Sequence, residues 1–534
     1  MHTKPVIGIL TAALAASTAA NAQAPVATPM VETQNGAVQG LEDDGIDAFL
    51  GLRYAAPPTG ENRFMPPQPA ANWRGTYDAT SMGAPCMQMY TPSGPNETAV
   101  TRQLQGIFPT YGEAKIDNED CLFLNVWTPE AGSGSRPVMV WFHGGGYDYG
   151  SGNWPAYNGR NLAEKGDVVV VTVNHRLNAF GYLDLSGYDG DYAASGNVGN
   201  LDLVAALEWV RDNIAAFGGD PANVTIMGES GGGSKVSHLL AMPAAAGLFD
   251  KAVIQSGPGV TGGKQDEARE LAGGLLEAAG VETVEELRAL PAEAIITAAR
   301  AALPPRGMGF ARGPRFGPVV DGEVLPRDPF LPRAPEVSQD VPILIGYNKD
   351  EATLFTAPQP WFGTLTNAQL DAMTVAMGEE AAQLVAYYRE QNPDDAPSYI
   401  ASAAMGSFFS RGTYVLADQK SRAGGAPVYV YRLTWETPVA DGLLRSPHTL
   451  EIPLMFDNAA ESAALVGTGP ETERMAEMLS DAWIAFAKTG TPSSPLLPEW
   501  QPYSVDSRVV MQLDIEPELV DDPEAGLRAI GAGG

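Results

Sequence analysis

The sequence is poor in basic residues, and this shortage excludes two kinds of partner. Its 534 residues hold 33 lysines and arginines against 64 aspartates and glutamates, a formal net charge of −31 at pH 7. A chain this acidic repels phosphate backbones and anionic lipid surfaces. We therefore expect no nucleic acid and no membrane surface among its partners, and we interpret the acidity as an aid to solubility.

Long hydrophobic runs are also absent, so the sequence predicts no membrane span. The strongest candidate is residues 5–16, about 12 apolar residues, which fall short of the ~20 that cross a bilayer. Lys4 before this run and Ala20-Asn21-Ala22 after it instead complete the pattern of a cleavable secretory signal. We expect residues 1–22 to be removed after Ala22 and the mature protein to be secreted or periplasmic.

Cysteine is scarce too, with only Cys86 and Cys121. In an oxidising compartment the two can pair and close a loop of about 35 residues, which a chain-entropy estimate values at roughly 4 kcal/mol; two buried free thiols are the alternative. The composition is otherwise that of a globular protein, 44% hydrophobic and 18% charged. Because large α/β enzymes carry one sheet through long chains, we expect residues 23–534 to form a single domain.

Short apolar runs alternate with longer amphipathic stretches in the middle of the chain. Each run is continuous in apolar residues, which is typical of strands covered on both faces and predicts a mostly parallel sheet with helical crossovers, an α/β fold. The runs are residues 138–142, 168–173, 224–227 and 252–255. Residues 203–217 have helical periodicity, and we expect Gly218-Gly219-Asp220-Pro221 to end that helix before the next strand.

Other segments are expected to surround and extend this sheet. Residues 31–39 carry an Asn35-Gly36 turn and predict a small hairpin at the edge of the fold. Residues 265–303 predict helices outside the sheet, where they can cover a site. Three later runs, residues 343–345, 428–431 and 509–513, are expected to extend the sheet, and residues 475–487 predict a helix.

Gly228-Glu229-Ser230-Gly231-Gly232 indicates a nucleophile. It follows a predicted strand and precedes a helical stretch, which is the strand-turn-helix setting of a nucleophile elbow, and its glycines allow a sharp turn. In a chain with 59 glycines the pattern alone is weak evidence, and an ordinary glycine-rich turn is the alternative. The setting makes Ser230 our candidate nucleophile.

His143-Gly144-Gly145-Gly146 directly follows another predicted strand. Acyl transfer needs donors aimed at the developing oxyanion, and glycines bring bare backbone N–H groups close to a substrate. We expect the N–H groups of Gly145 and Gly146 to form an oxyanion hole with that of Gly231. A flexible loop is the alternative interpretation.

A serine hydroxyl needs a base, and the chain has only five histidines. His2 leaves with the signal, His143 belongs to the glycine loop, and His175 and His238 are interpreted as structural. His448 lies in a predicted loop late in the chain, where the order serine, acid, histidine requires the base.

The third member of a triad should be a carboxylate at a strand end between Ser230 and His448. Asp350 and Glu351 follow the predicted strand at 343–345 and fit best, while Asp321 is a competitor that is easily read as a turn residue. Residue pattern alone does not separate Asp350 from Glu351.

Taken together, these residues resemble the type-B carboxylesterase family, which includes bacterial carboxylesterases, bile-salt lipases, cholinesterases and non-catalytic neuroligins. The resemblance runs from about residue 31 to 503 and implies the α/β-hydrolase fold. Beside the serine motif it includes Glu119-Asp120-Cys121-Leu122-Phe123-Leu124-Asn125-Val126, Phe217-Gly218-Gly219-Asp220-Pro221, Gly51-Leu52-Arg53-Tyr54-Ala55, Arg63-Phe64, Asn348-Lys349-Asp350-Glu351, Trp483-Ile484-Ala485-Phe486-Ala487 and Trp500.

The resemblance implies what the pattern leaves open. The family acid is the glutamate of its Asp-Glu pair, hence Glu351; it also implies a bridge between Cys86 and Cys121. Supporting positions around the triad fall on Glu229, Ser256 and Glu451. The sequence departs from many members at Gly231-Gly232-Gly233, where alanine commonly follows the serine, and at His175, where many have tyrosine. Neither departure argues against activity.

The substrate is much less determined than the reaction. No tryptophan occurs between the two cysteines, where cholinesterases use one to bind quaternary ammonium groups, so choline esters are not expected. Tyr90, Phe108 and Tyr111 are candidates for lining a gorge. Arg312 and Arg315 would favour a polycarboxylate ester if they faced the pocket, although a solvated surface role is the simpler interpretation.

The sequence therefore predicts a serine hydrolase that cleaves small carboxylic esters without a metal or cofactor, as a monomer or homodimer. Carbamates, amides or thioesters, or acyl transfer to an alcohol, would use the same residues. The runner-up is a non-catalytic binding module of the neuroligin kind, which predicts a broken triad, whereas all three members are present here.

Overall fold

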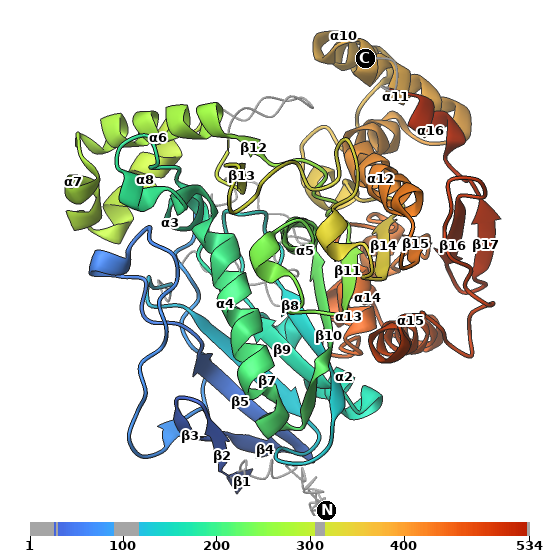
Figure 1. Ribbon diagram of the computed structural model, residues 1–534. Coiled ribbons are helices and arrows are strands. Elements are labelled where there is room, and N and C mark those ends of the chain that lie inside the picture. Colours follow the sequence, from blue (N-terminus) through green and yellow to red (C-terminus); the bar gives the residue numbers. More distant parts are fainter. Residues whose placement is uncertain (1–25, 28–29, 90–116, 305–314, 531–534) are drawn as a thin grey trace, which may run out of the picture.

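The protein is built around one large mixed sheet. The computed structural model describes residues 26–27, 30–89, 117–304 and 315–530 (Figure 1). Within them, twelve strands form this sheet in the order β1-β4-β5-β7-β9-β8-β10-β11-β14-β15-β16-β17. The predicted signal residues 1–22, the gorge candidates Tyr90, Phe108 and Tyr111, and Arg312 lie outside the described residues.

The middle of the sheet is parallel, as the continuous apolar runs predict. Its strands are β9 (Val169–Val173), β8 (Arg136–Phe142), β10 (Gly219–Glu229), β11 (Lys251–Gln255), β14 (Ile343–Asn348), β15 (Val428–Leu433) and β16 (Val509–Leu513). Gly218 ends the preceding helical segment with φ at 82°, as expected, but the next three residues of that motif already belong to β10.

Both edges of the sheet are antiparallel, which the sequence did not indicate. The amino-terminal edge consists of β1 (Val26–Ala27), β4 (Leu41–Asp43), β5 (Ile46–Arg53) and β7 (Phe123–Thr128), and β17 (Glu518–Asp521) forms the other. These strands are mostly short or carry polar residues, so their apolar runs are too weak to be recognised in the sequence.

Alternate residues of each central strand pack into separate hydrophobic clusters. In β8, Val138, Val140 and Phe142 join one cluster, while Met139 and Trp141 join the other, and all five side chains are fully buried. Helices α4 (Val198–Asn213) and α5 (Gly231–Leu239) contribute to the first cluster. Burying each large apolar side chain stabilises the fold by roughly 1.5–3 kcal/mol.

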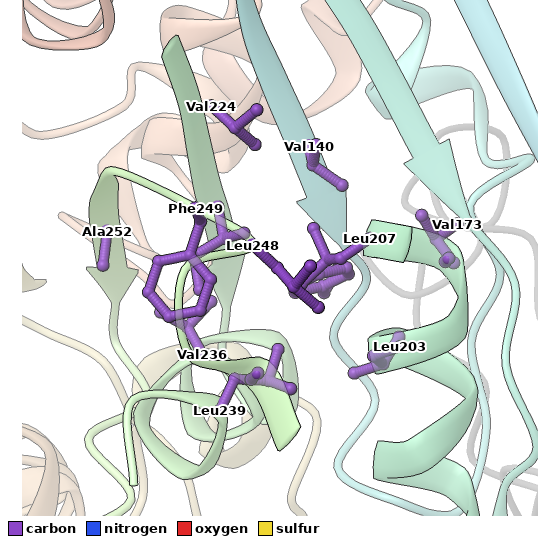
Figure 2. Packing of buried hydrophobic residues seen from close by; sticks show 14 of the residues in the cluster. Val140, Val173, Leu203, Leu207, Val224, Val236, Leu239, Leu248, Phe249 and Ala252 are labelled. Atoms are coloured by element: carbon purple, nitrogen blue, oxygen red, sulfur yellow. The ribbon is translucent and has the colours of Figure 1, made fainter. Parts of the chain in front are cut away.

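Figure 2 shows the first of these clusters in detail. Its labelled side chains include Val140 and Val224 from the sheet, Leu203 and Leu207 from α4, and Val236 and Leu239 from α5. The opposite face is covered by α2 (Arg160–Gly166), α13 (Glu451–Met455) and α15 (Pro470–Thr489), the last of which confirms the helix predicted at residues 475–487.

Two groups of helices stand beyond the sheet, at the end where α5 leaves β10 (Figure 1). One group, α6 (Gln265–Ala279), α7 (Val284–Ala289) and α8 (Ala292–Ala302), packs with α3 (Asn178–Tyr182) and confirms the helices predicted at residues 265–303. The other group was not predicted and comprises α10 (Asn367–Met377), α11 (Glu379–Gln391), α12 (Pro397–Ala423) and α16 (Ala525–Ala529).

The amino-terminal hairpin is present with a shifted turn. β2 (Val31–Thr33) pairs antiparallel with β3 (Gly36–Gln39), and β6 (Tyr77–Asp78) adds a third strand. The turn occupies Gln34 and Asn35, and Gly36 opens the second strand with φ at 136°. Among the described residues, no helix is both long and apolar enough to span a membrane.

Candidate active site

Ser230 lies at a sharp turn between β10 and α5, as predicted. Its φ of 56° and ψ of −123° lie outside the ordinary regions for a residue with a side chain. Its backbone N–H donates to the carbonyl of Gln255 at 2.8 Å, and its own carbonyl accepts from Ser234 at 3.0 Å. The strained conformation is therefore fixed by bonds on both sides.

The Ser230 side chain is reachable. The residue is partly exposed, and within the described part of the chain its Oγ forms no hydrogen bond. A glycine two residues on is required by space, because a Cβ on Gly232 would lie 2.0 Å from the carbonyl oxygen of Phe142. The start of α5 thus lies directly against the end of β8.

The glycine loop after β8 contacts the start of α5. A Cβ on Gly231 would lie only 2.2 Å from the carbonyl oxygen of Gly146. The backbones of these two glycines are therefore in direct contact, with no room for a side chain on Gly231. Gly145 and Gly146 have φ values of 86° and 63°, a conformation that favours glycine. The structure thus brings together Gly145, Gly146 and Gly231, the three residues whose N–H groups are the expected oxyanion donors.

His448 is paired with Glu351 and not with the competing acids. Its Nδ1 lies 2.5 Å from Glu351 Oε2, and its backbone N–H donates to the Glu351 carbonyl at 3.3 Å. Both side chains are buried. Asp350 instead lies 3.7 Å from Arg445, and Asp321 accepts from backbone N–H groups of its own turn.

A second carboxylate lies on the other side of the imidazole. Nε2 of His448 is 3.0 Å from Oε1 of Glu229, in a contact that lacks hydrogen-bond alignment. Burial raises the pKa of Glu229 well above its usual range, although His448 opposes that shift. Burial alone would lower the pKa of His448, but Glu229 and Glu351 outweigh it and raise that pKa to about 9.

Asn348 connects Glu351 with the loop that carries His448, a role that the sequence did not reveal. Its backbone N–H donates to Glu351 Oε1 at 2.8 Å, and its amide donates to the carbonyl of Pro447 at 2.7 Å and to Glu451 at 2.6 Å. Burial, followed by the charge of Glu351, raises the pKa of Glu451. The residue belongs to the Asn348-Lys349-Asp350-Glu351 motif, which was the available signal.

Gln255 ends β11, the strand next to the elbow, and Ser256 directly follows it. Ser256 is buried with φ at 47°, and its backbone N–H donates to Gly346 at 2.8 Å, while its Oγ has no partner among the described residues. Gln255 donates to Glu451 at 3.2 Å and accepts from the Trp483 indole at 3.0 Å. Glu451 is therefore held by two amides.

The remaining histidines are buried away from this pair. His143 and His175 stack with ring centroids 4.8 Å apart, and burial, followed by the charge of Lys235, lowers the pKa of each well below its usual value. His238 donates from Nδ1 to the carbonyl of Ser234 at 2.6 Å. All three are shielded from solvent.

The sequence did not reveal an aromatic cluster at His448, in which two phenylalanines contact the imidazole and a third packs against one of them. The ring centroids of Phe355 and Phe409 lie 5.2 and 4.8 Å from that of the imidazole, and the ring of Phe408 lies 4.0 Å from that of Phe409 with the two planes tilted by 32°. Phe355 and Phe408 are 48% and 40% exposed, so they offer apolar surface beside the base. They come from α9 (Thr353–Thr356) and α12, whose packing could not be derived from the sequence.

Cys86 and Cys121 form a disulfide, which confirms that prediction. Arg315, for which the sequence allowed either a pocket or a surface position, is partly exposed. In the described ranges, no group of histidine, cysteine, aspartate or glutamate side chains is arranged to hold a metal ion.

The parallel sheet with crossover helices, the elbow after a central strand and the late histidine loop define an α/β-hydrolase fold. A carboxylesterase of Geobacillus stearothermophilus has a similar structure, with a TM-score of 0.79 and 37% identity over 94% of this chain and 99% of that one. The sequence is 36% identical to the para-nitrobenzyl esterase of Bacillus subtilis over 93% of this chain and 97% of that enzyme. It is 34% identical to the phenmedipham hydrolase of Pseudarthrobacter oxydans over 91% and 95%.

Residues 27–526 match the Carboxylesterase family, and the chain belongs to that family. The protein is therefore a carboxylic ester hydrolase, as the sequence predicts, rather than a non-catalytic binding module.

Proposed function

We propose that the protein hydrolyses esters of small molecules in two steps, with Ser230 as nucleophile, His448 as general base and Glu351 as the acid that orients the histidine. The observation that carries this assignment is the 2.5 Å contact between His448 Nδ1 and Glu351 Oε2. A carboxylate there fixes the tautomer, so that Nε2 is free to accept a proton, and stabilises the imidazolium that follows.

The first step forms an acyl-enzyme. Ser230 Oγ attacks the ester carbonyl while His448 takes its proton, and the oxygen of the tetrahedral intermediate gains negative charge. The N–H groups of Gly145, Gly146 and Gly231 are the donors for that oxygen. His448 then protonates the departing alcohol.

The second step repeats the chemistry with water. His448 removes a proton from a water molecule, which attacks the acyl-enzyme and releases the acid and Ser230. Glu229, Ser256 and Glu451 support the pair. Glu229 faces Nε2, Glu451 anchors Asn348, and Ser256 directly follows β11, whose last residue accepts from the backbone N–H of Ser230.

The test is Ser230→Ala, with Ser234→Ala on the same helix as its control. We expect Ser230→Ala to fold and to lose hydrolysis of a short activated ester by at least ~10⁴-fold, since the remaining groups have no nucleophile to activate. It should also no longer react with a fluorophosphonate probe, while Ser234→Ala is labelled. Full activity in Ser230→Ala would refute the assignment.

The same residues would serve carbamates, amides or polycarboxylate esters, and a panel that varies acyl length, aromatic acids and polycarboxylate esters is the direct way to rank them. We further propose that residues 1–22 direct export and that residues 23–534 form one domain. The disulfide supports export, because such bonds persist in oxidising compartments.

A further inference from the structure

Lys235 is a lysine in an unusual place. It lies on α5, five residues after Ser230, and its side chain is 0% exposed. In the described part of the protein no carboxylate lies within ion-pair distance of its Nζ. Lysine is almost never fully buried without such a partner, because desolvating the ammonium is costly. The fold therefore keeps a group that does not stabilise it by ion pairing.

The ammonium of Lys235 contacts both ends of the glycine loop. Nζ donates to the carbonyl of His143 at 2.9 Å, directly before Gly144. It also lies 5.5 Å from the ring centroid of Tyr147, directly after Gly146, within the range of a cation–π contact. One side chain thus holds the residue that precedes the loop and the residue that follows it.

The other side-chain contact close to the start of α5 reaches only one end of the loop, because Oγ of Ser234 lies 2.7 Å from the hydroxyl of Tyr147, and the remaining contacts there are made by bare backbone. Gly231 and Gly232 have no side chains with which to hold it, and any Cβ there would collide with Gly146 or Phe142. Three glycines in the first turn of a helix also leave its backbone less rigid. Lys235 is the first residue of α5 whose side chain contacts the loop at both ends.

We propose that Lys235 is a positioning residue for the oxyanion loop: from a fully buried site it fixes His143 and Tyr147, so that the N–H groups between them stay aimed at the substrate oxygen. This inference rests on the proposed function, since it assumes that those N–H groups bind the oxyanion. The side chains around the Lys235 ammonium are consistent with this positioning role. The groups that face the ammonium are His143, His175, Tyr147 and Glu229, and burial lowers the pKa of Lys235 to about 7 although Glu229 opposes this.

The experiment compares Lys235→Met with Lys420→Met. Lys420 is a matched control because it is also buried and its Nζ also donates to backbone carbonyls, those of Ser338 and Gln339 at 3.0 and 2.7 Å. For Lys235→Met we expect kcat on a short activated ester to fall ~10–100-fold with KM within ~3-fold, because a loosened donor is felt mainly in the transition state. Lys420→Met should keep the kcat of the wild type per folded molecule.

A second measurement separates positioning from a general loss of structure. A trifluoromethyl ketone adds to the serine as an oxyanion, so its affinity should fall with kcat in Lys235→Met, whereas the affinity of the product acid should not change. Lys235→Gln serves if the methionine variant does not fold, and the same split is expected because its shorter amide cannot reach both contacts.

Wild-type kcat in a folded Lys235→Met or Lys235→Gln, or a loss of ketone and acid affinity by the same factor, would overturn the inference. Failure of the proposed function would look different, since the wild type itself would then be inactive or Ser230→Ala would remain active.

Discussion

Two buried carboxylates face one imidazole at the centre of this site. Glu351 contacts Nδ1 of His448, and Glu229 lies 3.0 Å from Nε2, the atom that a general base must use. Burial lowers the pKa of His448, but the two negative charges both favour the protonated ring. Together they outweigh burial and raise the pKa of His448 to about 9. A protonated His448 cannot accept a proton from Ser230, so activity should increase as pH rises toward that value.

Glu229→Gln should shift this pH dependence. The amide removes one of the two charges that raise the pKa of His448, so the ascending limb of kcat/KM should move to lower pH. The measurement is the midpoint of that limb from pH 5 to 10, whatever the height of the plateau. Glu436→Gln is the control, since Glu436 is exposed and paired with Lys349 at 3.1 Å. An unchanged midpoint in Glu229→Gln would show that Glu229 does not set the pKa of His448.

The residues of the site were not equally predictable from the sequence. Ser230 was found from its glycines and setting, and His448 from the small number of histidines. Glu351 needed the family resemblance, because neighbouring carboxylates in a loop can point to opposite sides, and Asp350 does turn to Arg445. Asn348 and Lys235 were not assigned roles, since their contacts are with backbone and side chains up to 103 residues away in the chain.

Two helices decide what surrounds His448. The short helix α9 follows Glu351 directly and presents Phe355, while the middle of α12 brings Phe408 and Phe409. In the proposed mechanism His448 protonates the departing alcohol, so groups beside its ring would lie on the alcohol side of the substrate. An apolar surface there favours alcohols with an aromatic or other apolar part.

Phe355→Ala should therefore discriminate between alcohols. Losing one aromatic contact is worth roughly 0.5–1.5 kcal/mol, so kcat/KM for benzyl acetate should fall by about 2–10-fold. Ethyl acetate, which shares the acyl group, should be affected much less. Equal losses on both esters would place Phe355 outside the alcohol site and would point to a general disturbance of His448.

The central strands were predictable because each is a continuous apolar run buried on both faces. The helices α10 and α11 were not, since they pack mainly on each other, on α12 and on α16, and α12 was not because its sequence, like theirs, mixes polar and apolar residues even though part of it packs on the sheet. The antiparallel edge strands were missed for a different reason, because β1 and β4 are too short to show a pattern of apolar residues. Local sequence thus indicates the interior of the sheet better than its borders.

The net charge and the disulfide have opposite effects on the stability of the whole molecule. A net charge of −31 favours solubility, but the repulsion among the acidic groups works against compactness. The disulfide between Cys86 and Cys121 joins residues 35 apart in sequence and restricts the unfolded chain.

Replacing both cysteines with serine should lower the free energy of unfolding by roughly 2–4 kcal/mol, because the unfolded chain regains the freedom of the open loop. Chemical denaturation followed by tryptophan fluorescence measures this change. Wild-type protein unfolded with a reductant should give the midpoint of the double variant, and wild-type protein without it should be more stable. Coincidence of all three midpoints would contradict the expected stabilisation.

The helices α6 to α8, and α10 and α11 with the start of α12, pack around hydrophobic clusters that are distinct from the two clusters of the central sheet, whereas the later part of α12 joins the first of those two clusters through Tyr414, Leu416 and Ala417. The framework that holds Ser230 and these outer helices are therefore stabilised largely separately. In evolutionary terms, mutations can accumulate in the surrounding helices without destabilising the catalytic framework. The same separation makes α6 to α8, α10 and α11 the natural target for directed evolution, since libraries confined to them change neither Phe409, which contacts His448, nor the core of the sheet.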